Sequence, residues 1–271
     1  MLRFAPFAVY SVRVAFPDAD RRALLLLAAA IGFATAVPET MSTPIKSLAK
    51  QDVVVLLHGM GRSALSMKRL EWALVNRGYR VVNVSYPSTR FPVEQLVERH
   101  LRPSLRALEE SSPARVHFVT HSLGGILLRQ YLATHALTNL GRVVMLGPPN
   151  RGSEVVDALK RWSCYRLMVG PAGQQLGTGD RDLPRTLGPA RFEVGVIAGD
   201  RSLNPFFSRL LPGPDDGKVS VAGARLEGMA DFLVVHHSHT WLPCRKSVIQ
   251  QVVSFLEIGR FTRRSGASVH G

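Results

Sequence analysis

Three stretches of the sequence carry side chains that could act together in nucleophilic chemistry: a lone serine, two adjacent aspartates and a group of histidines. They are FVTHSLGGILL (118–128), GPDDGKVSV (213–221) and HHSHTW (236–241). A serine hydroxyl is a weak nucleophile until a histidine accepts its proton and a carboxylate orients that histidine. The three residue types are therefore expected to meet, and the elements around them must bring them together.

Apolar runs and helical patterns alternate along the chain from Gln51. Six short apolar runs predict strands at 52–57, 79–86, 114–120, 141–147, 192–199 and 231–236. Helical spacing lies between them, at 63–76, from Pro92 to Leu108 with a kink at Pro103, and in a last helix that buries 248–256. Such alternation is typical of an α/β fold, a parallel sheet with helices on both faces.

The lone serine, Ser122, stands where the third strand becomes a helix. Ligands of a parallel sheet bind beyond the carboxyl ends of its strands, so a hydroxyl at this turn points into the ligand site. Gly124 and Gly125 would let the helix pack closely on the strand, and the helix N-terminus offers free N–H groups. This pattern is the nucleophile elbow, G-x-S-x-G. The alternative is a serine that only caps the helix.

With this elbow the chain resembles the α/β-hydrolase superfamily, in particular small bacterial lipases and esterases, from Asp52 to Phe261. One departure is Thr120, which stands where the motif has its first glycine. The resemblance implies an α/β-hydrolase fold, hydrolysis of carboxylic esters through an acyl-serine, no cofactor, and the catalytic order Ser, Asp, His.

The resemblance also selects among the competing carboxylates and histidines. The D-G-x-V pattern of the family fits Asp216, with Asp215 as a solvated neighbour and Asp200 as the alternative acid. A histidine on the loop after the last strand fits His239, and the alternatives are His236 and His237. The expected catalytic residues are therefore Ser122, Asp216 and His239.

Acyl transfer needs two preorganised N–H donors for the oxyanion. The family pattern implies the backbone of Leu123, directly after the serine, and that of Met60, in the loop HGMGRS that follows the first strand. The segment LGPPNRGS (146–153) is expected along the acyl pocket. The histidine group lacks a second carboxylate or cysteine at suitable spacing, so no metal is expected.

Residues 150–191 interrupt the alternation of strands and helices. They contain Trp162, Tyr165, Met168 and several glycines, and long excursions in compact domains are more often functional than not. We expect a small cap beside the site, the alternative being an ordinary crossover. The hydrolase domain is expected to span 37–263, followed by a flexible tail at 264–271.

The N-terminal segment 1–36 has the order of parts found in a secretory signal. Arg21-Arg22 precedes the apolar run 23–33, and Ala34-Thr35-Ala36 offers a cleavage site. The protein is thus expected in the periplasm or secreted. The alternatives are an uncleaved membrane anchor and a buried N-terminal helix. Export would allow a disulfide between Cys164 and Cys244, the alternative being two separate thiols.

The formal net charge of +14 favours acidic partners, among them an anionic membrane surface. Basic residues form no stripe interleaved with aromatics, so nucleic-acid binding is not expected. The expected substrate is a lipid or other acyl ester. Two alternatives stay open: an acyltransferase that uses the same three residues, and a non-catalytic protein that keeps the hydrolase fold for binding.

Overall fold

The predicted apolar runs form one parallel sheet. The computed structural model describes residues 51–263, and in it the strands lie in the order β2-β1-β3-β4-β5-β6 with every neighbouring pair parallel. The strands are β1 (Val53–Leu57), β2 (Arg80–Val84), β3 (Val116–His121), β4 (Leu140–Leu146), β5 (Val194–Gly199) and β6 (Asp231–Val235). The inner strands β1, β3 and β5 are wholly buried, whereas the edge strands β2 and β6 are partly exposed. Burial on both faces explains the continuous apolar sequences of β1 and β5, while β3 also buries His117, Thr120 and His121. The predicted α/β-hydrolase fold class is confirmed.

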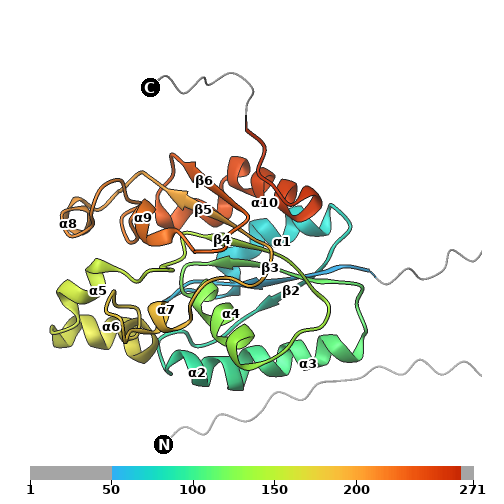
Figure 1. Cartoon of the computed structure of the whole chain (residues 1–271), viewed down its shortest axis with the longest axis horizontal. Coiled ribbons are helices and arrows are strands. Elements are labelled where there is room, and N and C mark those ends of the chain that lie inside the picture. The colour runs from blue at the N-terminus through green and yellow to red at the C-terminus, as the bar shows by residue number, and fades with distance from the viewer. Residues whose placement is uncertain (1–50, 264–271) are drawn as a thin grey trace, which may run out of the picture. The chain divides into compact units, whose positions relative to one another are not determined.

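Helices cover both faces of this sheet (Figure 1). In chain order they are η1 (Ala64–Met67), α1 (Lys68–Val75), α2 (Val93–Leu96), η2 (Val97–Leu101), α3 (Arg102–Glu110), α4 (Leu123–Thr134), α5 (Glu154–Leu159), α6 (Ser163–Gln174), α7 (Leu183–Thr186), α8 (Pro205–Ser208), α9 (Val221–Ala224), η3 (His239–Cys244) and α10 (Lys246–Ile258). Buried side chains of α2, α3 and α4 form the core on one face, and those of α1 and α10 form it on the other. Because all six strands are parallel, the loops at their carboxyl ends lie along one edge of the sheet.

The predicted helix from Pro92 is not uniform. It runs as α2, then as the π-helical segment η2, and then as α3, in which Pro103 stands in the first turn. Proline has no N–H group and its ring crowds the preceding turn, so the widened turn of η2 immediately before it accommodates the ring. The kink predicted at Pro103 takes this form.

The predicted signal (1–36) and tail (264–271) lie outside the described residues. Within 51–263 no helix has the length and apolar character needed to cross a membrane. The two cysteines are free thiols, so the disulfide is not formed in this structure. Cys164 is exposed at the start of α6, and the Cys244 thiol donates to the Trp241 carbonyl at 3.2 Å.

Candidate active site

Ser122 forms the sharp turn between β3 and α4. Its φ is +53° and its ψ is −122°, a conformation that non-glycine residues seldom adopt. The Ser122 N–H donates to the Leu146 carbonyl at 2.9 Å, and the Ser122 carbonyl accepts from Gly125 N–H at 2.9 Å. These two bonds, on neighbouring strand and helix, keep the turn in its strained form and leave the side chain at the end of the sheet.

The two glycines after Ser122 are required by the close approach of α4 to the sheet. A Cβ at position 124 would lie 2.6 Å from the Leu57 carbonyl oxygen, and one at position 125 would lie 3.2 Å from Pro148 Cβ. Any side chain at 124 would push α4 off β1. In a simple helix cap the serine side chain would accept hydrogen bonds from the first helical N–H groups. The Ser122 side chain makes no such bond, so THSLGG is a strand-to-helix elbow rather than a helix cap.

Asp216 lies at the carboxyl end of the sheet, in the loop after β5. One carboxylate oxygen, Oδ1, accepts from the N–H groups of Lys218 at 3.0 Å and Val219 at 2.9 Å. The other, Oδ2, lies 2.7 Å from His239 Nδ1. Since both oxygens are engaged and the side chain is buried, the carboxylate has a fixed orientation toward the histidine.

The two competing aspartates are turned elsewhere. Asp215 is buried, 7% exposed, and its carboxylate accepts from Ser208 Oγ at 2.9 Å and Gly217 N–H at 2.7 Å, so the prediction that it is solvated is wrong. A buried carboxylate needs such donors, and the tight turn before Gly217 supplies them. Asp200 pairs with the exposed His236 at 2.9 Å.

His239 is the first residue of η3 and is buried beside Asp216. The alternative histidines serve other contacts, His236 with Asp200 and His237 with Ser247 Oγ at 3.0 Å. Ser122 and His239 line one small pocket together. The structure thus brings together the three residues expected from the sequence, and it separates their competitors from them.

Two residues that the sequence did not single out hold this group in place. His121 Nε2 donates to the His239 carbonyl at 3.0 Å, and burial, with the neighbouring His239, puts the pKa of His121 well below its usual value. Gly147 has φ +53°, and a Cβ there would lie 3.0 Å from Asp216 Oδ2 and 3.1 Å from His239 Nδ1. The signal for Gly147 was available in the sequence, as a glycine that ends a strand facing the site.

The loop after β1 is fixed on both sides of Met60. The His58 ring stacks on Tyr86 with centroids 4.0 Å apart, the Tyr86 hydroxyl donates to the His58 carbonyl, and Gly61 N–H donates to Ser88 Oγ at 2.9 Å. A Cβ at Gly59 would lie 3.2 Å from Ser122 Cβ, so this loop runs beside the serine.

The Met60 and Leu123 N–H groups are available in this arrangement. Leu123 is the first residue of α4, where N–H groups have no helical partner. Within residues 51–263 neither N–H donates to another protein group. An oxyanion needs two free N–H donors of this kind, and here one comes from the residue after Ser122 and the other from the loop beside it.

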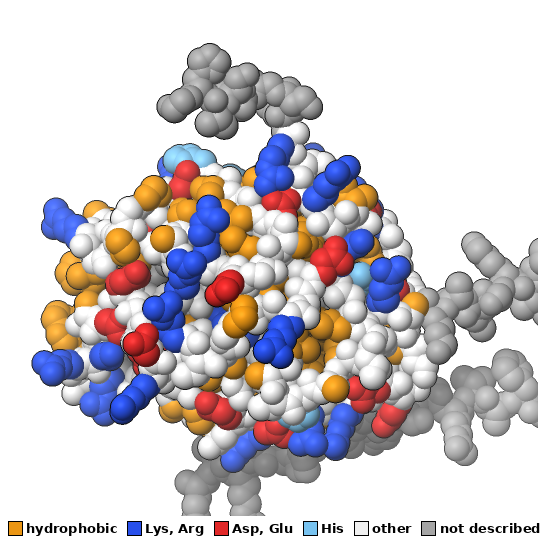
Figure 2. All heavy atoms as spheres, viewed as in Figure 1, with side chains coloured by type: hydrophobic (Ala, Val, Ile, Leu, Met, Phe, Trp, Pro, Cys, Tyr) orange, Lys and Arg blue, Asp and Glu red, His pale blue; other side chains and the backbone are white. Residues whose placement is uncertain are grey.

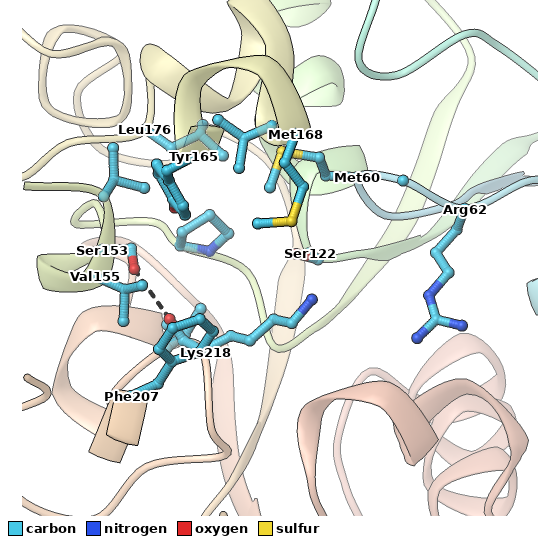
Figure 3. Close-up of a pocket in the computed structure, with 15 residues that line it drawn as sticks. Met60, Arg62, Ser122, Ser153, Val155, Tyr165, Met168, Leu176, Phe207 and Lys218 are labelled. Atoms are coloured by element: carbon cyan, nitrogen blue, oxygen red, sulfur yellow. Dashed lines mark hydrogen bonds between the residues drawn. The ribbon is translucent and has the colours of Figure 1, made fainter. Parts of the chain in front are cut away.

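A cavity of about 320 Å³ opens at Ser122 (Figure 3). Its wall is mostly apolar and comes largely from the segment 149–176, together with Phe207 and Val219. Burial raises the pKa of Tyr165, one of the wall residues, to about 12, so its hydroxyl stays neutral. The volume lies at the lower end of the ~300–1,000 Å³ typical of small-molecule sites. The helices α5 and α6 of the predicted cap segment thus supply the wall of a pocket that begins at the serine.

Metal ligands do not gather around the site. In the described part of the chain no three His, Cys, Asp or Glu side chains are grouped as a metal would require. The chemistry that the arrangement supports is proton transfer and nucleophilic attack by its own side chains.

Comparison with known proteins agrees with this geometry. The family model described as "Alpha/beta hydrolase family" matches residues 54–256. None of the curated proteins matches the chain.

Three solved structures illustrate the likeness. The mature lipase BlEst2 of Bacillus licheniformis has a TM-score of 0.60 at 20% identity, over 79% of this chain and 94% of that one. The metagenomic carboxyl esterase MGS0156 has a TM-score of 0.55 at 20% identity, over 72% of this chain and 66% of that one. Phospholipase PlaB of Legionella pneumophila has a TM-score of 0.54 at 16% identity, over 70% of this chain and 53% of that one. At these identities the likeness concerns the fold. Because the family model covers most of the chain and the elbow lies where the fold requires it, the chain belongs to the alpha/beta hydrolase family.

Proposed function

We propose that the protein is a serine hydrolase of carboxylic esters with an apolar acyl group. The observation that carries this proposal is the Asp216–His239 pair, at 2.7 Å, beside the strained Ser122 elbow at the mouth of an apolar cavity. A positioned base, a carboxylate that orients it and an exposed hydroxyl are the parts that acyl transfer needs.

The residues perform the reaction in two halves. Ser122 Oγ attacks the ester carbonyl while His239 Nε2 takes its proton, and the N–H groups of Met60 and Leu123 stabilise the oxyanion. The intermediate collapses to an acyl-serine, and the alcohol leaves with the proton held by His239. Water then attacks the acyl-serine, gives its proton to His239, and releases the acid and the free Ser122. Asp216 stabilises the imidazolium in both halves.

The surface around the cavity supports an apolar or lipid ester. Hydrophobic side chains are exposed at the edge formed by α5, α6 and α8, among Lys and Arg side chains (Figure 2). They include Leu167, which is 87% exposed, Met168 at 64% and Phe206 at 54%. Exposed apolar groups beside a ligand cavity are typical of surfaces that meet lipid or another apolar partner.

A fluorophosphonate probe tests the reaction class, because it labels only an activated serine. We expect labelling of the full chain and hydrolysis of 4-nitrophenyl butyrate, both lost in Ser122→Ala, with the residual rate lower by roughly 10³-fold or more. Ser104→Ala, on α3 and remote from the cavity, is the matched control and should retain both. Labelling that persists in Ser122→Ala would contradict the assignment.

We also propose that the protein is exported. The support is the order of Arg21-Arg22, the apolar run 23–33 and Ala34-Thr35-Ala36. Intact-mass measurement of the protein from its native compartment should give a mature chain that begins at or near Val37. A full-length chain in the cytoplasm would contradict export and leave the enzymatic proposal untouched.

A further inference from the structure

Two cationic side chains, Arg62 and Lys218, stand at the active site without an acidic partner. Arg62 follows the Met60 loop, and Lys218 follows Asp216 by two residues. Both line the acyl cavity and also the small pocket shared by Ser122 and His239. In Figure 3 the Lys218 ammonium points toward Ser122, while Arg62 extends on the other side of the serine.

Neither cation forms an ion pair within residues 51–263. Among the described residues, the Arg62 guanidinium donates only to Thr240 Oγ1, at 3.3 Å. The carboxylate nearest in sequence to Lys218, that of Asp216, is already engaged with His239 and two backbone N–H groups. Two cations near one another without a counter-ion repel each other, so an anion between them would be bound favourably.

The position of Lys218 is fixed by the site itself. Its N–H donates to Asp216 Oδ1 at 3.0 Å, and its carbonyl accepts from Ser153 Oγ at 2.9 Å. Although the residue as a whole is exposed, its ammonium lies among pocket atoms. This burial, together with the charge of Arg62, lowers the pKa of Lys218. A lysine whose pKa is perturbed beside a ligand cavity is a candidate for a functional role.

Arg62 and Lys218 stand where the acyl cavity meets the small pocket, because both residues line both. The apolar wall of the larger cavity accepts the acyl chain, whereas the small pocket contains His239, which must pass its proton to the leaving alcohol. Arg62 and Lys218 belong to this small pocket together with Thr240. The imidazolium formed on His239 during the reaction adds a third positive charge there, which a bound anion would offset.

We propose that Arg62 and Lys218 bind an anionic oxygen group, phosphate or carboxylate, on the alcohol portion of the substrate. The preferred substrate is then an ester with an apolar acyl chain and an acidic alcohol. This inference rests on the proposed ester hydrolysis and adds the class of leaving group. Arg62 suits two-pronged contact with such oxygens, and Lys218 supplies a point charge.

Matched ester pairs test the inference. One pair is 1-octanoylglycerol 3-phosphate and 1-octanoylglycerol, and the other is 3-octanoyloxy-4-nitrobenzoate and 2-nitrophenyl octanoate. We expect kcat/KM to favour the anionic member, chiefly through KM, and this preference to fall at high salt. A preference confined to the phosphate pair assigns phosphate, and one confined to the carboxylate pair assigns carboxylate. No preference in either pair would overturn the inference.

Variants locate the preference. Arg62→Gln and Lys218→Gln should each lower the anionic-to-neutral ratio of kcat/KM by roughly tenfold, as expected for losing a hydrogen bond to a charged group, while Arg62→Lys should keep part of it. Arg106→Gln, an exposed charge on α3, is the control for net charge and should keep the parent ratio. An unchanged ratio in both site variants, or an equal fall in Arg106→Gln, would overturn the inference.

A binding measurement separates this inference from the enzymatic one. Octyl phosphate is titrated calorimetrically into the full-length Ser122→Ala protein, alone and combined with Arg62→Gln or Lys218→Gln. We expect binding that each cation variant weakens several-fold. If no ester is hydrolysed but this dependence holds, anion recognition stands and the proposed function fails. If esters are hydrolysed at Ser122 but octyl phosphate binds all variants equally, the proposed function stands and anion recognition fails.

Discussion

Asp216 and His239 are joined twice, through their side chains and through their backbones. The Asp216 carboxylate lies 2.7 Å from His239 Nδ1, and the Asp216 carbonyl accepts from the His239 N–H at 2.9 Å. The two residues come from different loops, 23 positions apart. The backbone bond sets the distance between the loops, so the two side chains are held within hydrogen-bonding distance of each other.

This double link predicts that the acid cannot be exchanged for its neighbours. Asp216→Asn should lower kcat for an ester by roughly 10³–10⁴-fold, because an amide favours the wrong tautomer of His239 and cannot support its charge. Asp200→Asn, which breaks only an exposed pair, should change kcat little. Kinetics of the purified variants decide, and a crippled Asp200→Asn would move the acid to the end of β5.

The surroundings of Gly147 predict that the active site tolerates no side chain at this position. In Gly147→Ala the new methyl group would press on Asp216 Oδ2 and His239 Nδ1, so kcat should fall by more than the loss of stability explains. Gly188→Ala is the matched control, because Gly188 also has positive φ, +65°, but has open space around it. Both variants should lose about 1–2 kcal/mol of unfolding free energy from backbone strain. Equal activity in the two would argue against the predicted crowding.

The apolar cavity predicts a limit on acyl length. Val156, a buried residue of α5, forms part of the cavity wall, and Val156→Phe would fill part of its volume. The rate for an octanoate ester should then fall relative to that for a butyrate ester, as measured on one preparation of the variant. An unchanged ratio would mean that the acyl chain lies elsewhere. Overpacking should cost about 1–3 kcal/mol of stability, so folding is checked by thermal unfolding.

The burial of His121 predicts that the folded protein loses stability in mild acid. Its pKa is lowered in the folded state by burial, so below pH ~6.5 the unfolded chain binds a proton that the folded chain does not. The free energy of unfolding should therefore be independent of this group above pH ~6.5. Below that pH it should fall by up to about 1.4 kcal/mol per pH unit.

His121→Gln isolates this contribution, because a glutamine amide can replace the donor to the His239 carbonyl without titrating. The difference in unfolding free energy between the two proteins, measured in urea at pH 8, gives the packing cost of the substitution. The change in this difference between pH 8 and pH 5 gives the contribution of the proton. We expect a shallower acid dependence in the variant. It should not vanish, since burial also lowers the pKa values of His58 and His117. Parallel curves for the two proteins would contradict the prediction.

Local patterns in the sequence determined the fold class and the elbow. Strands of the sheet interior are buried on both faces, so the apolar runs of β1 and β5 are continuous and easily seen. The elbow is equally local, because Ser122, Gly124 and Gly125 lie within four residues. The close approach of Leu57 leaves no room for a side chain at position 124. Chain order and the resemblance then sufficed to predict Asp216 and His239.

Contacts between distant segments were decided only by the tertiary structure. The D-G-x-V pattern that selected Asp216 suggested that its neighbour Asp215 is solvated. In the structure Asp215 is buried against Ser208 and Gly217. A disulfide between Cys164 and Cys244 depends on the distance between their Cα atoms, which their spacing in the sequence does not give. In the structure both thiols are free. The meeting of Arg62 and Lys218 at one pocket was likewise invisible in the sequence. Their charges interact through space, and the two residues lie 156 positions apart in the chain, so the sequence gives no sign of the contact.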